Sequence, residues 1–223
     1  SVAIGYETLK AQNFTSATAS YNTAVGFHAG NDVTTGIDNT LIGGFAGDAI
    51  TTANSSVAVG KYALSGTTTG GANTAIGLQA LYANTTATLN TAVGYQSLVA
   101  NTTGASNTAV GGLALDANTT ASNNTAVGYS SLGANTTGTA NVAVGKATLE
   151  AATTADGNTA VGYASQDNTT TGANNTALGR HSMDGNTTGA DNVGVGAYAL
   201  AGNTTASNNT AIGKSALYAN TTG

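Results

Sequence analysis

The chain has 223 residues, of which only 7% are charged, with five Lys or Arg in all and a net charge of −5. So few basic residues, none of them clustered, argue against a protein that binds nucleic acid. The absence of Cys excludes disulfides and thiolate metal sites. The sequence also contains no run of about 18 apolar residues, the length that a membrane-spanning helix needs.

A five-residue motif ending in glycine organises the sequence from its first residue onward. The motif opens the chain as SVAIG at residues 1–5 and returns as NTAVG at residues 22–26. From Gly26 to Gly213 it recurs on a constant 17-residue period, so the chain holds thirteen copies. A fixed short period is the signature of a solenoid. We call this residue the marker glycine and number positions from it, so that −1 precedes it and +4 lies four places after it.

Each repeat is predicted to form one coil of a parallel β-solenoid. A helical hairpin repeat needs about 33 residues, and the β-branched, alternating stretch before the marker glycine is typical of a strand. We expect two strands of about five residues and two turns per coil, and a rod of roughly 60 Å from coils stacked at about 4.8 Å. The chain contains no Pro, which suits an unbroken hydrogen-bond ladder.

The first coil, at residues 1–21, is irregular and carries a four-residue insertion near Lys10–Ser20. Regular 17-residue coils follow at residues 22–223, so we expect a single domain over residues 1–223. Solenoids need atypical capping units for solubility, and neither end of this chain has one. The array is therefore expected to be a segment of a longer fibre.

Three columns predict the core, namely the aliphatic residue at −1, Ala at −2 and Leu at +4. Two residues interrupt the −2 column and four interrupt the +4 column: Leu41 and Gly194, then Gly30, Gly47, Gln166 and Met183. This core is thin for a coil of this length. The small −2 column, as at Ala75 and Ala92, would let another backbone approach closely, so we expect the chain to pack into an oligomer.

Polar columns repeat as regularly as the apolar ones. Asn at −4, as in Asn73 and Asn90, is expected to form amide ladders of the kind that stabilise stacked strands. Adjacent Thr at +8 and +9, from Thr34–Thr35 to Thr221–Thr222, are expected to add ladder and turn contacts. Asn at +7 creates Asn-x-Thr tripeptides that match glycosylation acceptors, which we interpret as a consequence of the repeat. These asparagines are Asn84, Asn101, Asn118, Asn135, Asn186, Asn203 and Asn220.

Reactive side chains are scattered through the array. His28 and His181 share position +2 but lie nine coils apart, too far to share a metal, and are expected on a solvated surface. Asp167 and Asp184 share a column in adjacent coils, which suits Ca²⁺, but the calcium-binding solenoid motif is missing. Catalysis needs groups that converge from distinct elements. We therefore predict no catalytic, cofactor-binding or metal-binding residue, no cofactor, and a protein that is not an enzyme.

Aromatic residues gather just after the marker glycine. Exposed aromatic side chains can serve recognition, and they can equally pack on one another along the rod, so both interpretations stay open. The residues are Tyr6, Phe27, Phe45, Tyr62, Tyr95, Tyr129, Tyr163 and Tyr198.

The motifs SVAIG at residues 1–5 and SVAVG at 56–60, followed by small residues and a second glycine, resemble the head repeats of YadA-like trimeric autotransporter adhesins. The NTAVGY repeats are also similar to segments of phage tail fibres. The resemblance covers the whole chain and implies a left-handed parallel β-roll, three chains around one axis, and a role in attachment outside the cell. The adhesin coil is shorter than the coil of this chain, and none of the family's binding residues maps onto this sequence.

The sequence as a whole predicts an all-β, parallel β-solenoid of about 13 coils that serves as a non-enzymatic, adhesive fibre segment. Its partners would be copies of itself, as a trimer, and a host-surface or glycan ligand, on a bacterial surface or a virion. The alternative is an ice-binding β-solenoid with Thr ladders. Against that alternative, adjacent strand residues point to opposite faces, whereas two threonine files on one flat face require the spacing Thr-x-Thr.

Overall fold

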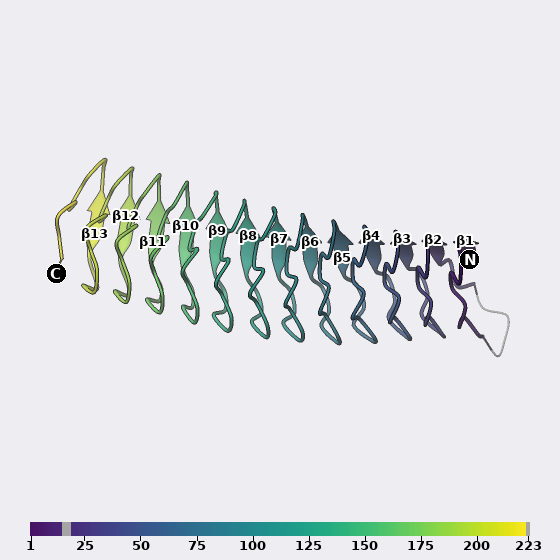
Figure 1. Ribbon diagram of the computed structural model, residues 1–223. Coiled ribbons are helices and arrows are strands. Elements are labelled where there is room, and N and C mark those ends of the chain that lie inside the picture. The colour runs from purple at the N-terminus through teal and green to yellow at the C-terminus, as the bar shows by residue number, and fades with distance from the viewer. Residues whose placement is uncertain (15–18, 222–223) are drawn as a thin grey trace.

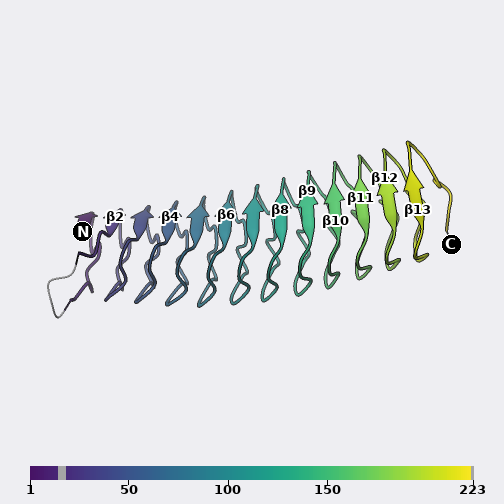
Figure 2. The same cartoon turned by 180° about the vertical axis from the view of Figure 1, so that it is seen from behind.

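The computed structural model describes residues 1–14 and 19–221, so residues 15–18, within the region of the insertion expected near Lys10–Ser20, lie outside the described residues. The described chain winds into one elongated stack of coils with its termini at opposite ends (Figures 1 and 2). Within it, thirteen strands pair in parallel and in chain order to form a single sheet. The expected parallel β-solenoid on a 17-residue repeat is confirmed.

Each coil contributes one three-residue strand that ends just before the marker glycine. The strands are β1 Val2–Ile4, β2 Thr23–Val25, β3 Thr40–Ile42, β4 Val57–Val59, β5 Thr74–Ile76, β6 Thr91–Val93, β7 Thr108–Val110, β8 Thr125–Val127, β9 Val142–Val144, β10 Thr159–Val161, β11 Thr176–Leu178, β12 Val193–Val195 and β13 Thr210–Ile212.

The prediction of two five-residue strands per coil is wrong because the rest of each coil is a chain of turns. In the coil of β6, the marker Gly94 has φ 140°, and three later residues are left-handed: Gln96 at 51°, Leu98 at 51° and Ser106 at 60°. A non-glycine residue in this region costs roughly 1–2 kcal/mol. Hydrogen bonds between coils offset the cost, as where Leu98 N–H donates to Ala114 O at 3.0 Å.

Two of the three predicted core columns lie inside the coil, and one does not. Ala92 at −2 and Leu98 at +4 are fully buried, as are most of their equivalents within the array, whereas Ala3 and Leu217 in the first and last coils are exposed. The aliphatic −1 column faces outward instead, with Ile76 39% and Val110 37% exposed. Alternate residues of a strand point to opposite sides of the sheet, so an inward −2 forces −1 and −3 outward. The expectation that the −2 column admits another backbone is also wrong, since this column fills the interior of its own coil.

Residues that interrupt the core columns compensate one another in size. Leu41 replaces Ala at −2 where +4 is glycine, and a Cβ on Gly47 would lie 2.8 Å from Leu41 Cδ2. A Cβ on Gly30 would lie 2.7 Å from Leu41 Cδ1. Farther along, Gly194 at −2 leaves room for Met183, whose Sδ would lie 3.0 Å from an added Cβ. The irregular residues therefore keep the interior filled at close to constant volume.

Two buried asparagine ladders tie the coils together, which confirms the expected ladder at −4 and adds a second at +7. Asn107 N–H donates to Asn90 Oδ1 at 2.9 Å, and Asn101 Nδ2 donates to Asn84 Oδ1 at 3.2 Å. Both ladders also converge within a coil, because Asn90 Nδ2 and Asn101 Nδ2 donate to Gly104 O at 2.9 and 3.0 Å. In the coils that carry Asn at both positions, the Asn-Thr-Thr turn is thus held from both sides.

The Thr pair and the Asn-x-Thr tripeptides follow from this arrangement. At +8, Thr102 Oγ1 donates to Thr119 O of the next coil at 3.0 Å, whereas Thr103 at +9 is exposed. The +7 asparagines from Asn84 to Asn203 are completely buried. Their amides are engaged inside the folded coil, so the tripeptides serve the fold, as the repeat suggested.

Gln166 is an exception to the hydrogen-bond pairing of polar side chains in this interior. It occupies the Leu column with no exposed surface, and neither of its amide atoms has a partner among the described residues. Nearby, Asn135 Oδ1 also lacks a donor, because Ala152 replaces Asn at +7 in the next coil. Buried polar groups without partners are destabilising.

We expect Gln166→Leu to stabilise the chain by about 2–4 kcal/mol, because it removes two unpaired polar atoms and restores the column residue. Urea denaturation followed by circular dichroism measures the change. The reverse substitution in the preceding coil, Leu149→Gln, is the control and should destabilise by a similar amount. A lower midpoint for Gln166→Leu would mean that the amide is satisfied in solution.

Candidate functional site

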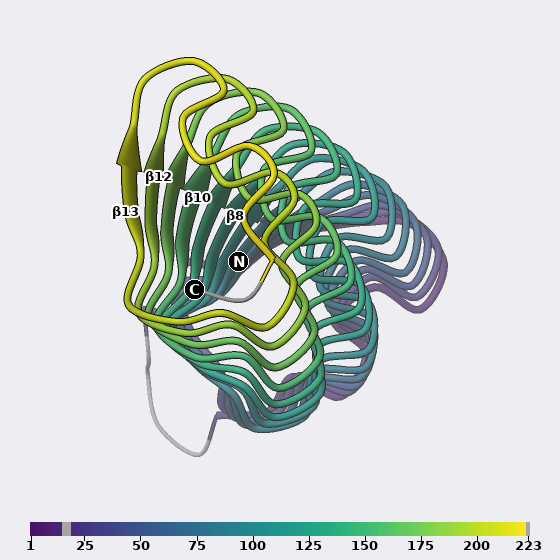
Figure 3. The ribbon, with the colours of Figure 1, turned by 90° about the vertical axis from the view of Figure 1, so that its left-hand side faces the viewer.

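The outward face of the sheet is the most regular surface of the protein. It consists of the side chains at −3 and −1 of each strand, which we call the sheet face. Because the strands pair in register, as Thr91 with Thr108 and Val93 with Val110, each column forms a continuous file along the rod. In the end-on view of Figure 3 the strands line one side of the coil, and the turns occupy the other sides.

The chemistry of the sheet face is one hydroxyl file beside one aliphatic file. Position −3 is Thr in most coils and Val in the others, and position −1 is always Val, Ile or Leu. Five aliphatic side chains at −1 within the array are 37–39% exposed. These residues are Ile42, Ile76, Val110, Val161 and Leu178. The −1 residues between them, such as Val59 and Val93, are half-buried. A file of partly exposed aliphatic side chains along the whole rod is unusual, because soluble monomers rarely keep apolar patches larger than a few hundred Å².

Position +1 borders the sheet face and carries most of the basic residues. Lys61, Lys146, Arg180 and Lys214 are all exposed there. Two of these cations lie over rings of the +2 column, with Lys61 Nζ 5.0 Å from the centre of Tyr62 and Arg180 Cζ 5.7 Å from Tyr198. The border is therefore positively charged and aromatic.

The aromatic residues form two stacks along the rod, which resolves part of the ambiguity left by the sequence. In the first stack the ring centroids of neighbouring coils lie 5.1–6.2 Å apart. Its members are Tyr6, Phe27, His28, Phe45, Tyr62 and Tyr82. The second stack contains Tyr163, His181, Tyr198 and Tyr218. Tyr95 and Tyr129 belong to neither stack and are 52% and 54% exposed.

The two histidines were expected on a solvated surface, and the structure instead places them inside these stacks. His181 lies 5.3 Å from both Tyr163 and Tyr198, and its side chain is 21% exposed. Each imidazole also faces a carboxylate: His28 Nε2 lies 3.3 Å from Glu7, and His181 Nδ1 lies 3.1 Å from Asp184. Coil stacking covers the ring faces because equivalent side chains repeat about every 5 Å.

Half of the acidic residues share one column at +5, a grouping that the sequence reasoning recognised only for Asp167 and Asp184. The other members are Asp48, Asp116 and Glu150. Burial raises the pKa of Asp167, and the neighbouring Asp184 carboxylate raises it further. Burial likewise raises the pKa of Asp116, with a smaller contribution from Glu150. Counting five places from each marker glycine would have found the whole column.

The described residues contain no group of three or more His, Asp or Glu placed to hold a metal ion. Over residues 1–14 and 19–221 there is also no helix of the length and apolar character needed to span a membrane. Comparison of the chain with protein-family models, with curated proteins and with solved structures finds no match.

Proposed function

We propose that this chain is a non-enzymatic segment of an extracellular fibre, in which three copies associate through their sheet faces and the remaining surface is presented for attachment. The observation that carries the proposal is the aliphatic file at −1, which is present in every strand from β1 to β13 and is exposed or half-buried in each of them. The left-handed roll, the threefold axis and the location on a bacterial surface or a virion follow the resemblance to adhesin heads and tail fibres.

Association through the sheet face has a clear driving force. Burying the exposed aliphatic side chains gains roughly 25 cal/mol for each Å² of apolar surface removed from water. The contact repeats in every coil on a backbone already fixed by hydrogen bonds, so little further ordering is needed on assembly. A thin core within each chain would be reinforced by a second apolar layer between chains.

Light scattering on the purified chain at micromolar concentration tests the proposal. The expected mass is about three times the 21.5 kDa of one chain. The double variant Ile76→Lys with Val110→Lys should dissociate into monomers, because each lysine would place a charge in the contact. The matched control, Ser106→Lys with Asn123→Lys, adds the same charge at exposed +12 positions and should stay trimeric. A monomeric parent chain would overturn the proposal.

Ice binding remains a second candidate because of one observation on the same surface. The adjacent Thr pair does not form a double array, but the sheet face presents Thr at −3 and a β-branched or other aliphatic residue at −1, as in Thr74-Ala75-Ile76. Hydroxyl and methyl groups are therefore repeated at the coil spacing in two parallel files. A monomer with thermal hysteresis that disappears in the Ile76→Lys, Val110→Lys variant would favour this candidate over the fibre.

A further inference from the structure

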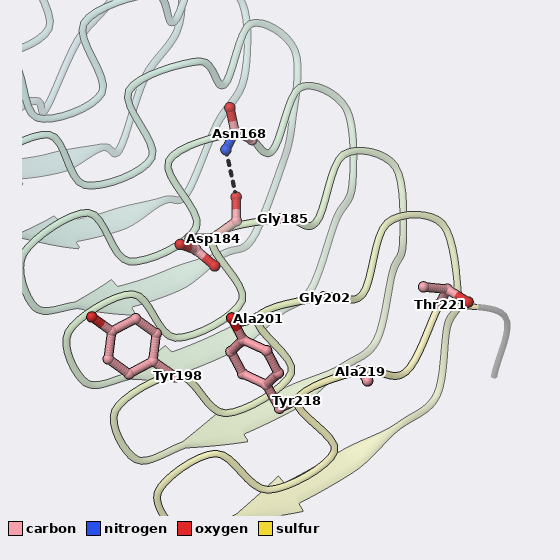
Figure 4. Close-up of a pocket in the computed structure, with 9 residues that line it drawn as sticks. All are labelled: Asn168, Asp184, Gly185, Tyr198, Ala201, Gly202, Tyr218, Ala219 and Thr221. Carbon is pink, nitrogen blue, oxygen red and sulfur yellow. Dashed lines mark hydrogen bonds between the residues drawn. The ribbon is translucent and has the colours of Figure 1, made fainter.

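A hollow of about 480 Å³ lies on the side of the last four coils, away from the sheet (Figure 4). It exists because the +5 column changes size: Ala201 separates the larger Asp184 and Tyr218. Gly185 and Gly202, both at position +6, complete a floor without side chains. The lining of the hollow consists of Asn168, Asp184, Gly185, Tyr198, Ala201, Gly202, Tyr218, Ala219 and Thr221.

Two tyrosine rings form the apolar wall of the hollow. Tyr198 and Tyr218 lie with their centroids 6.4 Å apart at an interplanar angle of 64°. Tyr198 is held on its other side by His181, whose ring is nearly parallel at 11° and 5.3 Å away. Tyr218 is 55% exposed, and Tyr82, at the same +5 position inside the array, is 41% exposed, so a ring in this column offers surface to a ligand. The wall therefore consists of the two tyrosine rings, and the His181 ring packs against Tyr198.

Polar groups stand opposite these rings. Figure 4 shows the Asp184 carboxylate beside the two tyrosines, while Asn168 lies on the far side of Asp184. Asn168 Nδ2 donates to Asp184 O at 2.8 Å and to Asp167 Oδ1 at 3.2 Å, which fixes the rim. The floor is fixed too, because Gly185 N–H donates to Ala201 O at 3.0 Å and Gly202 N–H donates to Tyr218 O at 2.8 Å. The hollow is thus formed before any ligand arrives, which lowers the entropic cost of binding.

We propose that this hollow binds one unit of an uncharged glycan, with the C–H face of a hexose ring against Tyr218 and Tyr198 and its hydroxyls donating to Asp184. Ligand sites combine aromatic walls with a few polar groups that fix orientation, and a hydrogen bond to a carboxylate is stronger than one between neutral groups. The inference rests on the proposed attachment role and names the class of ligand for it.

The charge of the site selects among sugars. Asp184 lines the hollow, Asp167 stands at its rim, and the described lining residues include no Lys or Arg. Arg180 lies next to the wall, with its Cζ 5.7 Å from the centre of the Tyr198 ring, so two carboxylates stand against one guanidinium. The chain as a whole carries a net charge of −5. Like charges brought together at an interface cost free energy, so uronate, sialylated and sulfated sugars should be rejected and neutral hexoses accepted.

Saturation-transfer NMR and calorimetry on the full chain test the proposal, with maltohexaose and cellohexaose as neutral probes and hexagalacturonate as the acidic probe. We expect a neutral probe to bind with a Kd of about 1 mM, as suits one shallow contact, and hexagalacturonate to bind at least about tenfold more weakly. Tyr218→Ala and Ala201→Phe should each weaken neutral binding at least about tenfold, the first by removing the wall and the second by filling the floor.

Tyr95→Ala is the matched control, because Tyr95 is 52% exposed and lies far from the hollow. Its binding should equal that of the parent chain. Equal binding by Tyr218→Ala, a preference for hexagalacturonate, or no binding of either neutral probe would overturn the proposal. Light scattering on the same samples separates this outcome from the fibre proposal: a trimer that binds no neutral sugar contradicts only the glycan site, whereas a monomer contradicts the fibre itself.

Discussion

Replacing Gly111 by Ala is expected to destabilise the array by about 4 kcal/mol or more, whereas Gly112→Ala, at the next position, should cost less than about 1 kcal/mol. Gly111 has φ 141°, a conformation that L side chains rarely adopt, and an added Cβ would lie 2.6 Å from the carbonyl carbon of Gly128. At Gly112 the nearest atom would be Tyr129 Cδ2 at 3.7 Å, an ordinary contact. Urea denaturation followed by circular dichroism measures both changes.

The pair of variants isolates the close approach of backbones at the marker glycine. Each coil contacts only its neighbours, so the loss should begin locally. Hydrogen exchange should therefore rise first in the amides of β7 and β8 and spread outward from them. Equal destabilisation by the two alanines would show that the marker glycine is retained for a reason other than this contact.

The second large effect is expected at the −4 ladder. Asn124→Ala should destabilise by about 3–6 kcal/mol, because it leaves several buried groups without partners. Asn124 Nδ2 donates to Gly138 O at 2.8 Å, and Asn124 Oδ1 accepts from Asn141 N–H at 2.9 Å and from Asn141 Nδ2 at 3.2 Å. The thermal midpoint and the urea midpoint should both fall.

The neighbouring residue supplies the control. Asn123 is exposed at +12 with φ 63°, a position that other coils fill with Ala72 or Ala140 at 56° and 57°. Asn123→Ala should therefore change stability by no more than about 1 kcal/mol. If Asn124→Ala proved as mild, the ladder would contribute little beyond the main-chain bonds. Gln166→Leu completes the comparison, since there the buried amide has no partner to lose and its removal should stabilise.

The sheet face and the hollow occupy different sides of the coil, so attachment and assembly can be tested separately. Lysines at Ile76 and Val110 leave the lining residues from Asn168 to Thr221 unchanged. Conversely, Tyr218 and Ala201 take no part in the strands. A monomeric double-lysine variant that still binds a neutral sugar would show that the glycan site is complete within one chain.

The repeat alone was enough to predict the parallel solenoid, the number of coils, the buried Ala and Leu columns and the Asn ladder. A fixed 17-residue period puts equivalent residues directly above one another. It follows that a column that is always small or always amide must be stacked in register, whatever the path of the chain within the coil.

The direction in which each column points was decided by the tertiary structure. The sequence predicts that the aliphatic −1 residues belong to the core. In the structure the −2 side chains point into the coil, so the −1 side chains point outward, because adjacent residues of a strand lie on opposite faces of the sheet. Left-handed turns at residues such as Leu98 carry no sequence signal, because inter-coil hydrogen bonds and packing override the preference of leucine. The hollow beside Tyr218 likewise depends on which side chains from successive coils meet, and that follows from the turns rather than from the period.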